Sequence, residues 1–154
     1  MLKKIVALLA TSLMIVTAGY AADETFEASI RVLAALAIVE NTALTFPDTE
    51  SRTIAQNVTV SPGSTGAASF NVYGEHNRLV NASIVEPSAS ATIGSSTVVF
   101  DSFSCGGALS GACQATLDNS GYANGAEIGA TAHIPANAQA GLYQGTLTFR
   151  VTYN

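Results

Sequence analysis

Short runs in which apolar and polar residues alternate recur along most of the chain. They span residues 44–46, 54–60, 68–73, 79–85, 97–103, 115–117 and 127–134, and most of them end at turn residues such as Pro, Gly, Asn or Asp. A last run, 143–153, alternates most regularly of all. Val, Ile, Thr, Phe and Tyr dominate these runs, and a period of two in such residues predicts β-strands.

The number and spacing of these runs predict an all-β fold. Seven or eight short strands separated by turns suit an antiparallel β-sandwich of immunoglobulin-like architecture. The Cys-Trp-Cys spacing of antibody domains is absent, because the chain contains no Trp. We find no internal repeat and no linker that divides the chain, so we expect one β-domain.

Residues 25–32 admit two interpretations. They alternate as a strand would, which places four side chains on one side: Phe26, Ala28, Ile30 and Val32. A helical stripe over 30–38 also fits, and Glu27 and Arg31 have the spacing of an i,i+4 ion pair. We favour the extended form because the rest of the chain predicts strands.

The first 21 residues have the features of a secretory signal peptide. A basic start with Lys3 and Lys4 precedes an apolar stretch, 5–16, and small residues occupy Gly19 and Ala21. We expect cleavage after Ala21 and an exported chain that begins at Ala22. A membrane anchor is the alternative, but the apolar stretch is short for the roughly 30 Å hydrocarbon core of a bilayer.

Charge excludes one large class of function. The formal net charge is −5, and both lysines lie in the predicted signal peptide, so the remainder holds four Arg against 11 acids. Such a chain is a poor match for a nucleic-acid backbone. An apolar content of 48% also argues against a disordered acidic tail.

The two cysteines predict a short disulfide. Cys105 and Cys113 enclose a loop rich in Gly and Ala, and an exported protein meets an oxidising environment. A metal pair and a redox pair are the alternatives. Both are disfavoured, because no His or third Cys lies nearby and the spacing is not C-x-x-C.

The sequence predicts neither an enzyme nor a cofactor. No G-x-S-x-G elbow, D-x-D calcium pattern or phosphate-binding Gly loop is present. His76 falls in a predicted turn and His133 on a predicted strand, and nothing in the sequence ties them to one site. With only two His and two Cys, we expect no metal site.

The C-terminal run resembles the C-terminal motif of pilins that are assembled by the chaperone–usher pathway. Gly141 is the fourteenth residue from the end and the aromatic Tyr153 is penultimate, with alternating apolar residues between them. The ending of the chain, 133–154, and the segment 70–75 are also similar to a family of exported bacterial proteins of unknown function whose pattern is related to that of fimbrial subunits.

This resemblance implies a sandwich that lacks one strand. The missing strand leaves an apolar groove, which a periplasmic chaperone covers before the N-terminal extension of the next subunit replaces it. Residues 22–33 are then the candidate donor strand, with Phe26, Ala28, Ile30 and Val32 entering the groove, and 34–154 form the domain. The resemblance assigns the groove edge to Gly141, Tyr143, Leu147, Phe149, Val151 and Tyr153.

Two functions from different classes follow. The first is a structural subunit of a cell-surface fimbria, whose partners are identical subunits, a periplasmic chaperone and an outer-membrane usher. The second is a self-contained secreted β-sandwich that binds a glycan or a matrix component. The sequence leaves open whether residues 33–39 belong to the donor strand or to the domain.

Overall fold

The computed structural model describes residues 22–154, which contain nine β-strands and no helix. The predicted signal peptide, 1–21, lies outside the described residues. In chain order the strands are β1 (Ala37–Thr42), β2 (Gln56–Val60), β3 (Ala68–Tyr73), β4 (Leu79–Ile84), β5 (Ala89–Ile93), β6 (Ser96–Gly107), β7 (Gln114–Thr116), β8 (Tyr122–Ile134) and β9 (Phe149–Tyr153).

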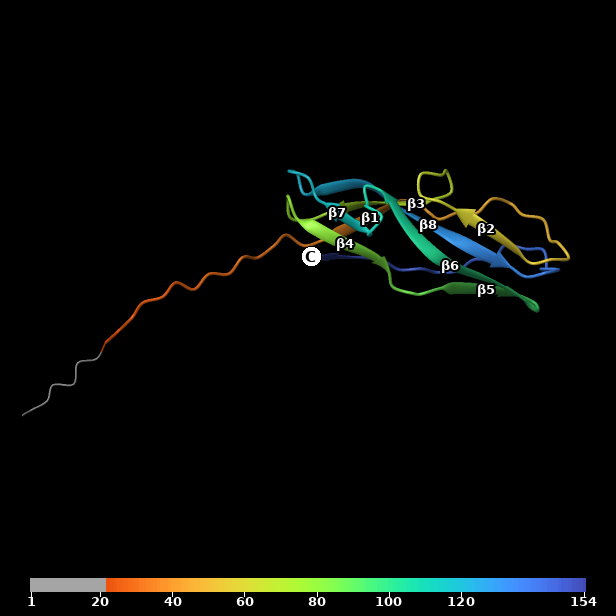
Figure 1. Ribbon diagram of the computed structural model, residues 1–154, viewed down its shortest axis with the longest axis horizontal. Helices are drawn as coiled ribbons and strands as arrows, with labels where there is room; N and C mark the ends of the chain where they lie inside the picture. The colour runs from red at the N-terminus through yellow and green to blue at the C-terminus, as the bar shows by residue number, and fades with distance from the viewer. Residues whose placement is uncertain (1–21) are drawn as a thin grey trace, which may run out of the picture. The chain divides into compact units, whose positions relative to one another are not determined.

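The strands form two antiparallel sheets. The larger sheet has the order β1-β3-β8-β6-β5, and the smaller one β7-β4-β9. The long strand β8 has two neighbours on one edge, because its first half pairs with β3 and its second half, Ala130–Ile134, pairs with β2. In Figure 1, β4 and β7 lie toward one end of the domain and β2 and β5 toward the other. The predicted all-β, antiparallel sandwich is confirmed.

The core falls into two clusters. The first lies between the sheets and includes Val72, Val80, Leu117, Ala126 and Ile128, all of which are almost fully buried. The alternation of the sequence places these residues on inward faces.

The second cluster lies at the other end of the larger sheet. Its buried members are Ala91, Val98, Phe100 and Ala132, and no strand of the smaller sheet contributes a residue to it. The smaller sheet therefore covers only part of the larger one.

Two predictions about individual elements are wrong. The strand expected at 44–46 is absent, and the chain instead forms β1 just before it, where Ala37–Thr42 pairs with β3. The helical alternative over 30–38, which the sequence analysis disfavoured, is also absent. The run 143–153 is a strand only over Phe149–Tyr153, because the preceding residues have no ladder partner. The strand β5 was not predicted, since its residues are mostly small.

The predicted disulfide is confirmed. Cys105 lies in β6 of the larger sheet and Cys113 immediately precedes β7 of the smaller sheet. Both cysteines pack against the first core cluster, as does the buried Leu109 inside the loop that they close. The bond therefore links the two sheets.

Residues 22–31 belong to a unit separate from the compact unit formed by 32–154. They have no helix or strand. The side chains of Phe26 and Ile30 are 88% and 90% exposed. We call residues 22–33 the N-terminal arm.

Candidate functional site

An open groove of about 820 Å³ lies above the second core cluster. Val98 and Phe100 of β6 and Ala132 and Ile134 of β8 form its floor, and Val58 of β2 extends that floor sideways. The groove exists because the smaller sheet stops short of this end of the larger one.

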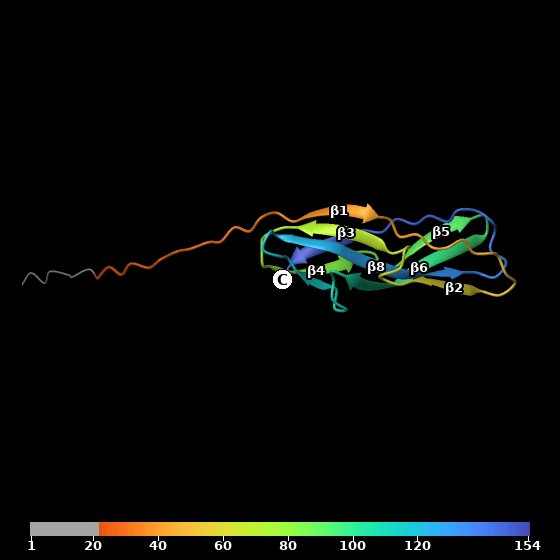
Figure 2. The ribbon, with the colours of Figure 1, turned by 90° about the horizontal axis from the view of Figure 1, so that it is seen from above.

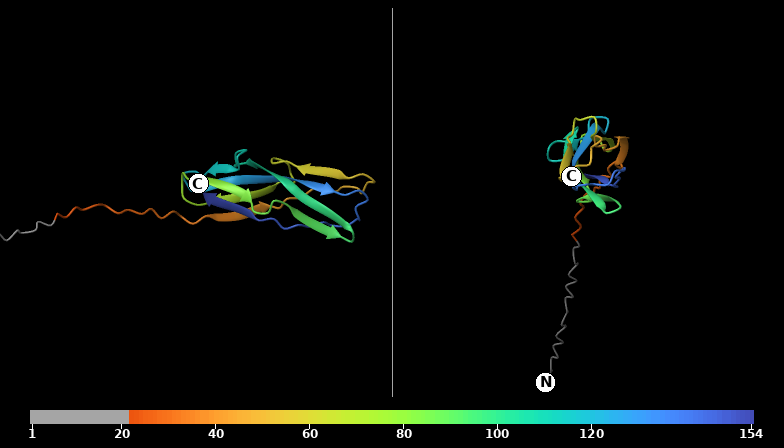
Figure 3. Two further views of the ribbon diagram at one scale, coloured as in Figure 1. Left: turned by 60° about the horizontal axis from the view of Figure 1, so that its bottom comes forward. Right: turned by 90° about the vertical axis from the view of Figure 1, so that its right-hand side faces the viewer.

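Two extended segments border the groove. The N-terminal edge segment, residues 43–51, follows β1, and the C-terminal edge segment, residues 141–147, precedes β9. Figures 2 and 3 show the chain after β8, in dark blue, returning along the domain to reach β9. Phe46 and Tyr143 pack against the second core cluster, and Leu44 and Leu147 also line the groove.

The C-terminal edge segment lies directly on the larger sheet at Gly145. A Cβ atom at this position would lie 3.1 Å from the Cβ of Ala89 and 3.3 Å from Cδ2 of Phe100. The absence of a side chain thus allows the backbone to approach β5 and β6 closely. The odd-numbered residues that flank it, Tyr143 and Leu147, are half-buried, whereas the even-numbered ones are exposed.

Two hydrogen bonds connect the N-terminal edge segment to the rest of the domain, one near each of its ends. The Thr45 amide donates to the Gly66 carbonyl at 2.8 Å, and the Ser51 hydroxyl donates to the Ala138 carbonyl at 2.8 Å. Between these anchors the Phe46 ring lies 5.5 Å from that of Phe100.

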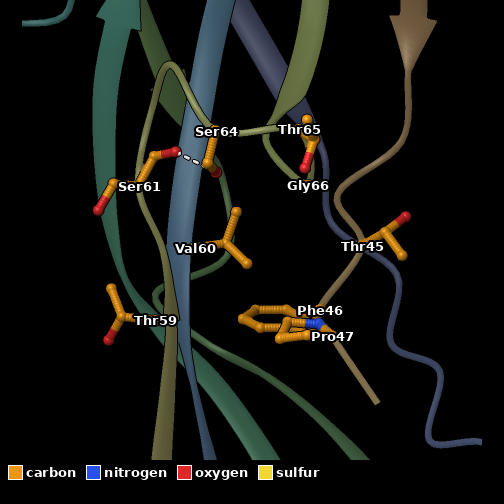
Figure 4. Close-up of a pocket in the computed structure, with 9 residues that line it drawn as sticks. All are labelled: Thr45, Phe46, Pro47, Thr59, Val60, Ser61, Ser64, Thr65 and Gly66. Carbon is orange, nitrogen blue, oxygen red and sulfur yellow. Dashed lines mark hydrogen bonds between the residues drawn. The ribbon is translucent and has the colours of Figure 1, made fainter.

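A smaller pocket of about 480 Å³ lies between this segment and the end of β2 (Figure 4). It is lined largely by hydroxyl side chains and by the rings of Phe46 and Pro47. Its presence means that residues 45–47 do not form a ladder with β2.

The backbone along the groove lacks strand partners. Within the described chain, residues 142–147 make no backbone–backbone hydrogen bond, and the first such contact beyond them is Val85 donating to Thr148. Unpaired amide and carbonyl groups beside an apolar floor are the two features that an added β-strand satisfies. Among the described strands β1 pairs only with β3 and β9 only with β4, so each of them has one edge without a strand partner.

A carboxylate holds the point at which β9 leaves the groove. Glu86 accepts hydrogen bonds from the Thr148 amide and hydroxyl, both at 2.7 Å. These bonds, helped by the nearby Arg150, keep the pKa of Glu86 below its ordinary value. We call this contact between Glu86 and Thr148 the latch. It lies between the paired strand β9 and the unpaired residues before it.

His133 lies on the opposite, outward face of the larger sheet. Its Nε2 atom lies 2.7 Å from Oδ1 of Asp101 in β6, and its Nδ1 atom lies 2.8 Å from Oδ1 of Asn57 in β2. The hydrogen bonds from His133 and Ser102 lower the pKa of Asp101. His133 thus connects three strands, while His76 remains in a turn, 3.8 Å from Glu75.

Residues 22–154 hold no group of three or more His, Cys, Asp or Glu side chains arranged to bind a metal ion. The same residues contain no helix that is long and apolar enough to cross a membrane.

The sequence model of one family, described as a domain of unknown function (DUF4402), matches residues 37–153. The chain belongs to the DUF4402 family. Searches of curated proteins and of solved structures find no match. The DUF4402 match begins at the first residue of β1 and ends at the last residue of β9.

The structure of this DUF4402 domain brings some of the predicted site residues together and separates others. Gly141, Tyr143 and Leu147 line the groove. Phe149 and Val151 instead pair with β4 and pack against the first core cluster, where Phe149 stacks on Phe70 with a ring separation of 4.3 Å.

Tyr153 also packs against that first cluster. The candidate donor residues lie in the N-terminal arm.

Sequence analysis missed the other side of the groove. Phe46 and its neighbours were expected to be a strand, so their position as an open border was not foreseen. Pro47 was the available signal, because proline removes an amide donor and ends a ladder.

Proposed function

We propose that this protein is a structural subunit of an extracellular fibre and that it polymerises by donor-strand complementation. The observation that carries this proposal is the apolar groove whose C-terminal border, residues 142–147, makes no backbone–backbone hydrogen bond within the described chain. An inserted strand would cover the apolar floor and would supply hydrogen-bond partners to residues 141–147.

The N-terminal arm has the composition that such a strand needs. Phe26, Ala28, Ile30 and Val32 alternate with polar residues, and the three large members of this row are at least 83% exposed. Burying each large side chain would contribute about 1.5–3 kcal/mol. Ala28 is the small member of the row.

Length supports the same assignment. The arm has 12 residues, from 22 to 33, and the C-terminal run from Gly141 to Tyr153 has 13. At about 3.3 Å per residue, either segment spans about 40 Å when extended. One arm therefore suffices for one neighbouring subunit.

Export fits this function. The disulfide between Cys105 and Cys113 is consistent with an oxidising compartment. We propose that a periplasmic chaperone covers the groove in transit, that an outer-membrane usher accepts the subunit, and that the finished fibre is on the cell surface.

Substitution of the arm tests the proposal. In chains that begin at Ala22, Ile30→Asp should abolish multimers that resist SDS and dissociate on boiling, because a charge cannot enter the apolar groove. Ser29→Asp is the matched control, since residue 29 lies on the other side of the extended arm, and it should still form multimers. Deleting residues 22–33 should likewise give monomers. Fibres of normal length from the deletion would refute the proposal.

A further inference from the structure

The groove carries charge at one end only. Among all the side chains that line it, Asp48 and Glu50 alone are charged, and both are acidic. They lie next to Ser51, whose hydroxyl bond to the Ala138 carbonyl marks that end of the groove. Arg52 follows in sequence but does not line the groove.

The N-terminal arm has the complementary asymmetry. Its acids, Asp23, Glu24 and Glu27, occupy the first half, and its single cation, Arg31, lies near the end that joins the domain. Arg31 is on the polar side of the extended arm, between Ile30 and Val32. The two ends of the arm therefore differ in the sign of their charge.

We infer that Asp48 and Glu50 attract Arg31 of the incoming arm and thereby determine the direction and register in which it enters the groove. This inference rests on the proposed function. With Arg31 beside the two acids, the apolar row extends from the groove toward β9. With the arm reversed, Asp23 and Glu24 would approach Asp48 and Glu50, and like charges would repel.

The selected direction also suits a growing fibre. The domain that provides the arm would lie beyond the end of the groove marked by Ser51. The chain enters its own domain at the opposite end, where the Tyr153 hydroxyl donates to the Ala34 carbonyl at 2.7 Å. Each subunit would then receive an arm at one end and offer its own from the other.

Charge reversal tests the inference in chains that begin at Ala22. Arg31→Glu should slow the appearance of SDS-resistant multimers about tenfold in low salt, because three acids then meet at one place. Asp48→Lys with Glu50→Lys should slow it similarly, because Arg31 then meets two cations. The chain with all three changes restores opposite charges and should assemble at close to the original rate.

Two controls make the outcome specific. Arg78→Glu changes the net charge by the same amount but lies outside the groove, so it should assemble at the original rate. Raising NaCl to about 0.5 M should reduce the effect of Arg31→Glu, because salt screens exposed charges. Equal melting temperatures would show that the variants fold.

The possible results separate the two proposals. If the unmodified chain forms no multimers, the proposed function fails and this inference fails with it. If the unmodified chain assembles but Arg31→Glu has no effect, or the triple change does not restore the rate, only the charge-guided register is wrong.

Discussion

The hydroxyl of Tyr153 donates a hydrogen bond to the Ala34 carbonyl at 2.7 Å and accepts one from the Glu75 amide at 2.6 Å. It thereby joins the residues that precede β1, the turn after β3 and the last residue of β9. A single phenol thus closes the end of the sandwich opposite the groove.

Removing this hydroxyl should destabilise the fold. We expect Tyr153→Phe to lower the free energy of unfolding by about 1–2 kcal/mol, because the partly buried Glu75 amide loses its acceptor. Urea denaturation measures the change. Tyr143→Phe removes one exposed hydrogen bond, to the Gln139 carbonyl, and should cost less. Equal losses of unfolding free energy in the two variants would contradict the larger contribution that we assign to the Tyr153 hydroxyl.

Gly74 is packed against the same hydroxyl. A Cβ at residue 74 would lie 2.5 Å from the Tyr153 oxygen and 2.7 Å from a methyl group of Leu36. Gly74→Ala should therefore cost about 1–3 kcal/mol through overpacking. Gly111→Ala is the control, because a Cβ there would have no neighbour within 4 Å. Thermal melting compares the two, and a stable Gly74→Ala variant would show that the contact relaxes easily.

The sequence predicted the parts of this fold in which alternation and side-chain size agree. Runs such as 68–73 and 79–85 form strands with nearly the predicted bounds, and the pair Cys105–Cys113 forms the predicted bond. Alternation failed at 143–148, because an alternating chain forms a strand only where a neighbouring strand provides hydrogen bonds. The open groove depends on which segments of the folded chain lie beside one another, and alternation along the sequence does not report that arrangement.

The disulfide should stabilise the domain by linking its sheets. Replacing Cys105 and Cys113 together by Ser should lower the free energy of unfolding by about 2–3 kcal/mol, because the unfolded chain regains the freedom of the loop. Reducing agent should lower the melting temperature of the unmodified chain to that of the double variant. It should not change the melting temperature of the double variant itself. A melting temperature that is insensitive to reduction would contradict this role.

Glu86 makes the start of β9 sensitive to acid. Its pKa in the folded chain is below the ordinary value of 4.5, mainly because the Thr148 hydroxyl and amide donate to the carboxylate. A carboxyl with a lowered folded pKa stabilises the fold above its unfolded pKa, and this stabilisation is lost as pH falls through the folded pKa. The contribution of Glu86 should therefore be present at neutral pH and should disappear progressively below about pH 4.5.

The substitution Glu86→Gln isolates this contribution, because the amide keeps the shape of the side chain without its charge. The variant should be less stable than the unmodified chain at pH 7 and should approach it at pH 3. Urea midpoints across this range provide the measurement, and hydrogen exchange at residues 148–150 would locate the change. Asp101 also has a lowered pKa, through its bonds from His133 and Ser102, so it remains unmodified in both chains and its effect cancels in the comparison. A difference in stability that does not depend on pH would show that the latch acts through shape and not through charge.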